Sequence, residues 1–234
     1  MVIEIQDIFI IQTKNKKKIF GKNFLLIYKH QLPVSRRFHT TVKYENNLII
    51  FGGKDFDSLN VFPKEIWSFS LTKETFKEII VEGKTYPRYE HTSVLINDLM
   101  IVFGGLYFDQ RNIRTSILDL KKKKWIYNQE EEEEKKKFLI LPDPRSKHTA
   151  VVYKNQLYIF GGVNDKFEFL NDLWCFDHKK IEWKKINPIT KISKRYGHCS
   201  IVKDKYMYIF GGETKNLKND FEKLNVKLKE MFFF

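Results

Sequence analysis

The chain has 234 residues, with 42 lysine and arginine residues against 29 aspartate and glutamate residues and a formal net charge of +13. A hydrophobic fraction of 42% suffices for a globular core and excludes wholesale disorder, while two cysteines exclude a disulfide scaffold and a four-cysteine zinc site. No apolar run of the sequence reaches the roughly 20 residues that a membrane-spanning helix needs.

The first 35 residues contain two apolar, β-rich runs, EIQDIFIIQ at residues 4–12 and FLLIY at residues 24–28. We expect these runs to be the third and fourth strands of a four-stranded unit that lacks its first two strands. The apolar stretch at the N-terminus is short and follows acidic residues, unlike a secretory signal. This pattern favours a cytoplasmic, intracellular protein.

One motif recurs four times from residue 36 onward. An arginine is followed three residues later by a histidine, and a glycine pair begins thirteen residues after that histidine, at the end of an apolar β-rich run. The members in chain order are Arg36, His39, Gly52 and Gly53; Arg88, His91, Gly104 and Gly105; Arg145, His148, Gly161 and Gly162; and Arg195, His198, Gly211 and Gly212. The spacing predicts a strand, a turn and a second strand in each unit, and we expect structural roles for these residues, with the arginines buried in hydrogen-bonded or inter-unit positions.

Two further strands are predicted after each glycine pair. The third alternates apolar residues, and the fourth begins at a large aromatic residue such as Phe76, Trp125 or Trp183. The predicted repeats span residues 36–80, 88–128, 145–187 and 195–234. Residues 129–144 are predicted to be a low-complexity acidic and basic loop between the second and third repeats.

The glycine pairs, the arginine and histidine before them and the fourth-strand aromatics resemble the kelch repeat over residues 36–234. The resemblance implies an all-β fold, a β-propeller of four-stranded antiparallel blades. We expect four blades plus an N-terminal half blade, residues 1–35, with the fourth-strand aromatics packed against the next blade. The ring is then either incomplete or completed by pairing with another propeller fragment or a second copy.

In such blades, the loops between the second and third strands share one face with the connections between blades. These loops are rich in aromatic residues and arginine, which commonly anchor protein interfaces. The candidate partner-binding residues are Phe56, Phe62, Tyr107, Phe108, Arg111, Arg114, Phe167 and Phe169. The alternative is that some of these aromatic rings pack on neighbouring blades.

Two related families raise the question of catalysis. Galactose oxidase has kelch-like blades with copper and a Tyr–Cys linkage, but we expect Cys175 and Cys199 to be small core residues, and nothing marks a partner tyrosine. Plant specifier proteins hold iron with Glu, Asp and His, whereas here Phe176 stands where the histidine would follow Glu168 and Asp172. We therefore expect no enzyme, no cofactor and no metal site.

The sequence predicts a non-catalytic scaffold or adaptor that binds a partner protein through the face formed by these loops. One alternative is a propeller that binds a polyanion through its lysine-rich surface, and another is a fragment of a larger kelch-containing adaptor or enzyme. Because 35 of the cationic residues are lysine and only 7 are arginine, we interpret the charge as solvated surface rather than as a nucleic-acid interface.

Overall fold

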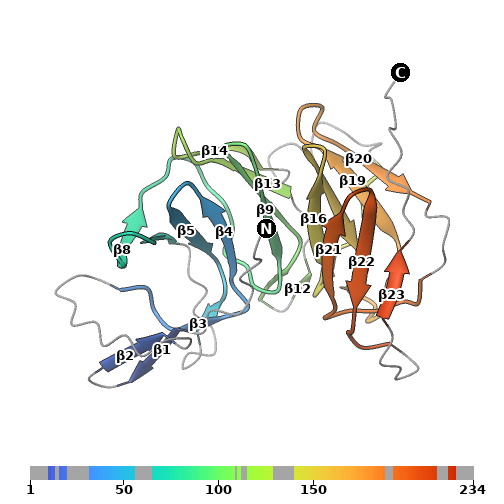
Figure 1. Cartoon of the computed structure of the whole chain (residues 1–234), viewed down its shortest axis with the longest axis horizontal. Helices are drawn as coiled ribbons and strands as arrows, with labels where there is room; N and C mark the ends of the chain where they lie inside the picture. Colours follow the sequence, from blue (N-terminus) through green and yellow to red (C-terminus); the bar gives the residue numbers. More distant parts are fainter. Residues whose placement is uncertain are drawn as a thin grey trace.

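The computed structural model describes residues 10–13, 16–19, 32–55, 65–108, 110–111, 115–128, 140–187, 192–214 and 221–224, and these residues form strands, turns and loops without a helix. Figure 1 shows a series of β-sheets, from the blue sheets on the left through the green sheet in the centre to the overlapping yellow and red sheets on the right. The prediction of an all-β fold with four-stranded antiparallel blades is confirmed.

Each blade runs through its strands a to d in chain order. Blade 1 contains β4 (Thr40–Tyr44), β5 (Asn47–Phe51), β7 (Ile66–Ser70) and β8 (Thr75–Ile79). Blade 2 contains β9 (Thr92–Ile96), β10 (Leu99–Phe103), β13 (Thr115–Asp119) and β14 (Lys124–Asn128). Blade 3 contains β16 (Thr149–Tyr153), β17 (Gln156–Phe160), β19 (Leu173–Asp177) and β20 (Glu182–Ile186). The described strands of blade 4 are β21 (Cys199–Lys203), β22 (Tyr206–Phe210) and β23 (Phe221–Leu224).

Short strands and one isolated bridge hold the connection that enters a blade beside the b–c loop of the same blade. In blade 1, β3 (Arg36–Arg37) pairs with β6 (Lys54–Asp55), and in blade 3, β15 (Arg145–Ser146) pairs with β18 (Val163–Asn164). In blade 2, β11 (Leu106–Tyr107) and β12 (Gln110–Arg111) form a hairpin within the b–c loop, and Tyr89 of the entry connection bridges Leu106. We call this end of the molecule, at the bottom of Figure 1, the loop face.

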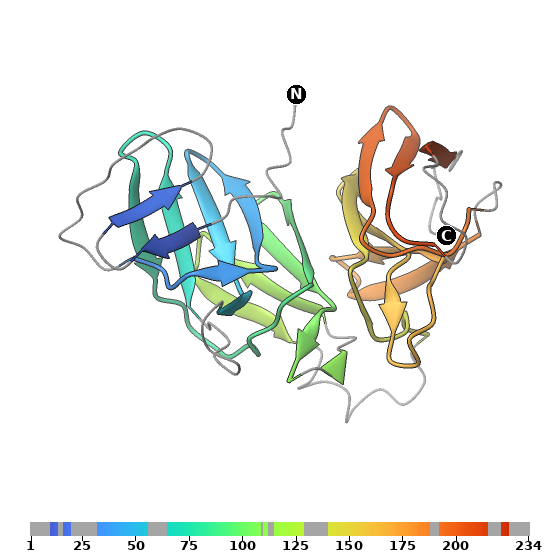
Figure 2. The same ribbon diagram turned by 90° about the horizontal axis from the view of Figure 1, so that it is seen from below.

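The N-terminal strands form a hairpin beside blade 1. Strand β1 (Ile10–Thr13) pairs with β2 (Lys16–Ile19), and its Ile10 also pairs with Arg36 of β3. Figure 2, seen from below, shows this hairpin in front of blade 1. Strand β1 overlaps the run predicted as a third strand, but residues 24–28, the predicted fourth strand, lie outside the described residues, so the half blade stays a prediction.

The hydrophobic core lies between the blades rather than within them. The a strands of neighbouring blades contact one another, from β4 to β9, β9 to β16 and β16 to β21. Between blades 1 and 2, for example, Phe51 and Ile66 of one sheet are buried together with Met100 and Leu118 of the next. Stacking is therefore what removes each sheet's apolar faces from water.

Trp125 and Trp183 of the d strands pack on the preceding blade, so the expectation that these aromatic residues pack on the next blade is wrong for both, whereas Phe76 packs on Phe69 of its own blade. The rings of Trp125 and Phe51 of blade 1 are centred 5.5 Å apart, and those of Trp183 and Phe103 of blade 2 are 4.7 Å apart. The reason is strand register, because Trp125 pairs with Leu118, a member of the core cluster shared with blade 1.

Three of the four glycine pairs form a joint with the next blade. The amide of the second glycine donates to the carbonyl oxygen of the next blade's motif arginine, and the first glycine faces that same carbonyl and the motif histidine ring. The amide bonds are Gly53 to Arg88 at 2.8 Å, Gly105 to Arg145 at 2.9 Å and Gly162 to Arg195 at 2.9 Å. We call this contact the glycine joint.

Gly104→Ala should lower the free energy of unfolding by about 2–4 kcal/mol, because its Cβ would lie 2.7 Å from both the Arg145 carbonyl oxygen and the His148 ring, at a φ of +67°. Gly211→Ala is the matched control. Its φ is +70°, but no described atom lies within 4 Å of the added Cβ, so a loss of about 1 kcal/mol is expected. Urea unfolding measures both variants, and equal losses would show that the joint does not hold the blades together.

Candidate functional site: the loop face

The four motif arginines fix the base of the loop face. Each is at most 3% exposed, and its Nη1 donates to the carbonyl oxygen of the first motif glycine of the same blade. The pairs are Arg36 with Gly52 at 3.2 Å, Arg88 with Gly104 at 3.5 Å, Arg145 with Gly161 at 3.1 Å and Arg195 with Gly211 at 2.9 Å. These side-chain bonds tie each blade's entry to the end of its own b strand, whereas the backbone carbonyl oxygens of Arg88, Arg145 and Arg195 accept a bond from the preceding blade.

Blade 3 adds a carboxylate to its arginine. Arg145 donates to both oxygens of Asp172, at 2.7 and 2.9 Å, and the Trp174 indole donates to the same carboxylate at 2.6 Å. Burial alone would raise the pKa of Asp172, but the hydrogen bonds and charge of Arg145 outweigh it and lower that pKa. Glu168 accepts a hydrogen bond from Asn164 at 3.0 Å. Glu168 and Asp172, the two carboxylates compared above with the iron ligands of plant specifier proteins, therefore both have hydrogen-bond partners within the blade.

Three of the four motif histidines, His91, His148 and His198, belong to the joints between blades. Their Nε2 atoms share a hydrogen bond with a threonine Oγ1 of the preceding blade. The pairs are Thr40 with His91, Thr92 with His148 and Thr149 with His198, each at 2.8 Å. Each of these rings also meets the phenylalanine before the preceding glycine pair, with centroids 5.3–5.5 Å apart. Because the histidines occupy different joints, they do not converge on one point, and the described part of the chain holds no group of three or more metal-ligating side chains.

Burial keeps these histidines neutral. It lowers the pKa of His198 to about 3, with the nearby Arg195 charge adding to the effect. It lowers the pKa of His39 to about 4 in the same way, beside Arg36. A protonated ring would therefore be costly in any of these joints.

Stability should fall as the pH drops below about 6.5. The unfolded state then protonates His198 at its ordinary pKa of 6.5, while the native state keeps it neutral until the pH nears 3. The contribution of neutral His198 to the free energy of unfolding is therefore complete above pH 6.5. Between pH 6.5 and about 3, this contribution falls by about 1.4 kcal/mol per pH unit. Urea unfolding of wild type and His198→Gln at pH 7, 6 and 5 measures this, and the variant should show the shallower slope. Identical slopes would contradict a neutral His198.

A backbone ladder runs between the blades beside the histidines. The residue before each motif histidine has a positive φ. In blades 2 to 4, the amide of this residue donates to the carbonyl oxygen of the equivalent residue in the preceding blade. The bonds are Glu90 to Phe38 at 3.1 Å, Lys147 to Glu90 at 3.2 Å and Gly197 to Lys147 at 2.8 Å. This ladder and the glycine joints hold the loops of neighbouring blades at fixed spacing.

Two candidate residues present aromatic rings to solvent. Phe108 is 56% exposed and Phe167 is 75% exposed, and their backbones adopt φ values of +47° and +57°. A positive φ is uncommon for bulky residues. Phe108 and Phe167 adopt it although more than half of each residue remains exposed. The geometry turns both rings outward.

Other candidates link neighbouring blades. The Arg111 guanidinium lies 4.8 Å from the centre of the Phe167 ring, and its backbone amide donates to Asp165 at 3.1 Å, which joins the loops of blades 2 and 3. Phe169 packs on Tyr196 of blade 4 with ring centres 4.8 Å apart, as the alternative interpretation expects. Tyr107 contacts Phe108, with ring centres 4.4 Å apart. Phe56, Phe62 and Arg114 lie outside the described residues.

The sequence interpretation missed the aromatic residues at the entries of the blades. Phe38 and Tyr86 are exposed on this face, and the Tyr86 ring lies 6.0 Å from that of Tyr107. Lys54 lies over the Tyr89 ring at 5.2 Å, and in the same way Lys147 lies over the Tyr196 ring at 5.3 Å. For Phe38, Tyr89 and Tyr196, the available signal was their position between a motif arginine and its histidine.

The two cysteines differ in their surroundings. Cys175 is buried opposite Tyr158, and burial raises the pKa of its thiol to about 11, as befits a core residue. Burial likewise raises the pKa of the Tyr158 phenol, so a tyrosine does lie beside this cysteine, with both groups protonated near neutral pH. Cys199 is exposed, so the expectation of a core position is wrong for it. Its strand partner in blade 4 is Phe210.

The comparison with known proteins agrees with this geometry. A family model described as the KLHDC2/KLHL20/DRC7 Kelch-repeats domain matches residues 6–212. The chain belongs to the kelch-repeat family. The resemblance inferred from the glycine, arginine and histidine motif is therefore confirmed.

Several curated kelch proteins are similar to this chain. Kelch domain-containing protein 3 of Bos taurus is 28% identical over 196 residues, which cover 78% of this chain and 49% of that protein. Kelch domain-containing protein 2 of Bos taurus is 29% identical over 197 residues, covering 74% and 47%. The Leucine-zipper-like transcriptional regulator 1 homolog of Drosophila melanogaster is 29% identical over 219 residues, covering 86% and 22%. The chain spans about half the length of the first two relatives.

Membrane insertion through a helix has no candidate in the described part of the chain, which contains no helix that is long and apolar enough to cross a bilayer.

Proposed function

We propose that this kelch domain is a non-catalytic scaffold that binds a partner protein through its loop face. The observation that carries the proposal is the outward presentation of Phe108 and Phe167 on strained backbone, next to the cation of Arg111. Aromatic and arginine side chains supply most of the binding energy at protein interfaces, and strained backbone concentrates at functional sites.

Rigidity of the scaffold supports the same proposal. The glycine joints, the ladder through Glu90 and Lys147 and the buried arginines hold the loop bases by hydrogen bonds that do not depend on a partner. A partner therefore meets loops whose bases are already fixed, which reduces the entropy lost on binding. Both cysteines are unpaired, which also supports our proposal that the protein works in a reducing, intracellular compartment.

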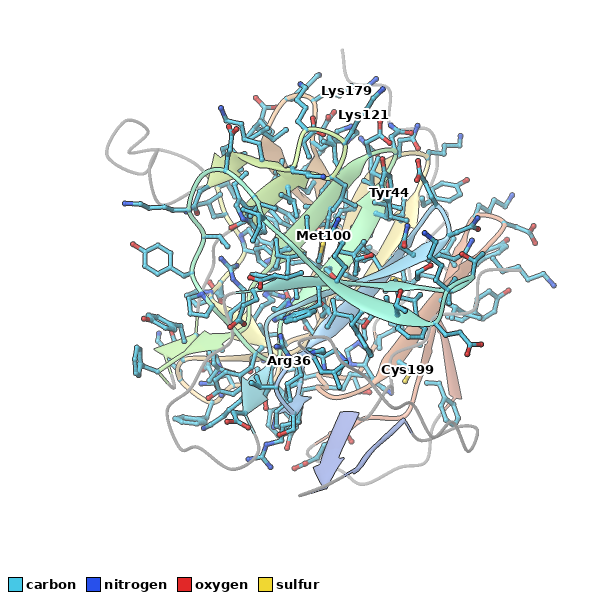
Figure 3. All side chains as sticks on the ribbon, turned by 90° about the vertical axis from the view of Figure 1, so that its left-hand side faces the viewer. Arg36, Tyr44, Met100, Lys121, Lys179 and Cys199 are labelled. Carbon is cyan, nitrogen blue, oxygen red and sulfur yellow. The ribbon has the colours of Figure 1, made fainter. Side chains whose placement is uncertain are left out.

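A second candidate function, binding of a polyanion, rests on the opposite end of the blades. Figure 3 places Lys121 and Lys179, both in c–d turns, at the end of the blades far from Arg36. The acidic residues Asp119 and Asp177 begin these turns and accept bonds from turn amides, so the turns also have a structural role. Their lysines are exposed and without a shared pocket, which leaves this candidate weaker.

The test compares the double variant Phe108→Gly/Phe167→Gly with Leu71→Ala. Glycine tolerates the positive φ of both loop positions, so the double variant should keep the thermal stability of the wild type. Leu71 is an exposed apolar residue in a c–d turn at the other end and serves as the matched control. Partners captured from native lysate are identified, and the affinity of each purified partner is measured by calorimetry.

The double variant should lose roughly 30-fold or more in affinity, equivalent to about 2 kcal/mol, while Leu71→Ala binds as the wild type does. A partner that binds both variants equally would contradict the loop face as the binding site. If binding instead weakens steeply with salt and with Lys121→Glu/Lys179→Glu, the polyanion candidate replaces it.

A further inference from the structure

The motif arginine of blade 1 lacks a hydrogen bond that its three counterparts make through Nη2. The three bonds are those from Arg88 to Ser116, from Arg145 to Asp172 and from Arg195 to Ser193. The Nη2 atom of Arg36 is buried and bonds to no acceptor in the described part of the chain. The Glu65 carboxylate lies 3.8 Å from it, which is too long for a hydrogen bond.

A second buried donor of blade 1 is unpaired in the same way. Trp67 is 5% exposed, and its Nε1 atom is buried without a hydrogen-bond acceptor among the residues that the structure describes. In blade 3, Trp174 donates from Nε1 to Asp172 at 2.6 Å. The two tryptophans occupy equivalent positions, because Trp67 pairs with Ile50 and Trp174 with Ile159, each two residues before the glycine pair.

The two unpaired donors correspond to the donors that hold a carboxylate in blade 3. There, Asp172 accepts hydrogen bonds from both terminal nitrogens of Arg145 and from the Trp174 indole. The residue at its position in blade 1 is Glu65, since each directly precedes the first residue of the c strand. Glutamate is one methylene longer than aspartate, and the Glu65 side chain is 43% exposed against 16% for Asp172. Blade 1 therefore keeps the two donors, but its own carboxylate does not reach them as a hydrogen-bond acceptor.

Burial of the Arg36 guanidinium outweighs the carboxylates around it. Its side chain is 0% exposed, and burial lowers the pKa of Arg36 to about 10 although Glu65 and Asp55 act to raise it. A buried cation with an unsatisfied donor gains free energy from a negatively charged acceptor that reaches that donor. Blade 3 shows that a carboxylate suits this frame of donors.

We propose that blade 1 binds a small free carboxylate, of the size of formate or acetate, between Arg36 Nη2 and Trp67 Nε1. The ligand takes the place that the side-chain carboxylate of Asp172 has in blade 3, and it ties the entry of the blade to its c strand. Glu65, which is partly exposed beside the site, turns aside to admit it. A ligand of three heavy atoms is limited to a dissociation constant of about 1 mM even when every contact is good.

The indole protons of the four tryptophans provide the readout for the test. Sodium formate replaces sodium chloride at constant ionic strength in a solution of the 15N-labelled full chain, and the proton on each Nε1 is followed by NMR. The Trp67 signal should move downfield and saturate, with half of the change below about 10 mM formate. The Trp174 signal should stay in place, because its proton is already bonded to Asp172. The variant Trp67→Phe assigns the first signal.

Exchanging the two carboxylate residues supplies matched controls. Glu65→Asp gives blade 1 a side chain of the length found in blade 3, so the Trp67 signal should lie downfield without formate and should no longer respond to it. Asp172→Glu makes the reverse change in blade 3 and should make the Trp174 signal respond. Glu65→Ala removes a competing charge, so the formate concentration at half saturation should fall about threefold.

Three results would overturn the proposal. The first is a Trp67 signal that stays unchanged up to about 100 mM formate, far above the expected dissociation constant. The second is an equal response of all four indole signals. The third is an upfield move of the Trp67 signal in Glu65→Ala without formate, which would show that Glu65 itself is the acceptor. The variant Phe108→Gly/Phe167→Gly should keep the formate response, so this proposal and the loop-face proposal fail independently.

Discussion

The hydrogen bond from the second glycine of one blade to the motif arginine carbonyl of the next sets the spacing on which the rest of the structure depends. It forms at 2.8 Å between Gly53 and Arg88 and recurs at 2.9 Å in the next two joints. At this separation, a Cβ on the first glycine would overlap the carbonyl and the histidine ring, so the position accepts only glycine. The same joint brings the a strands together and closes the apolar clusters between blades.

The motif arginines and histidines form one electrostatic unit around that bond. A buried guanidinium is stable only if its donors are satisfied, and Arg145 achieves this with the Gly161 carbonyl and the Asp172 carboxylate. Its charge in turn helps burial to hold the pKa of His148 well below the ordinary value. The neutral ring can then share its hydrogen bond with Thr92 and pack on Phe103. The loops that start at this unit are fixed before any partner arrives.

Much of the fold follows from spacing in the sequence, because each motif residue is required at a fixed distance along the chain. Gly104, Arg145 and His148 were predicted as structural from their period alone, and they do meet in one joint. The period does not reveal which blade a side chain faces, since that depends on strand register. The direction of packing of Trp125 and Trp183 was therefore mistaken.

The candidate site was less accessible to sequence reasoning. The exposure of Phe108 and Phe167 depends on positive φ values that tertiary contacts impose, and no local pattern marks them. The threonine partner was visible, because Thr40, Thr92 and Thr149 each follow a motif histidine directly. At the same position in blade 4, Cys199 marks the one described joint face that differs chemically from the others.

The loop face owes its shape to the glycine joint, so the joint is tested first. Native-state hydrogen exchange of the glycine amides measures it directly. The account predicts that the amides of Gly105 and Gly162 exchange only when blades separate, at least a hundredfold more slowly than the amide of Gly212, which has no next blade among the described residues. Equal exchange rates at the three glycines would contradict the account.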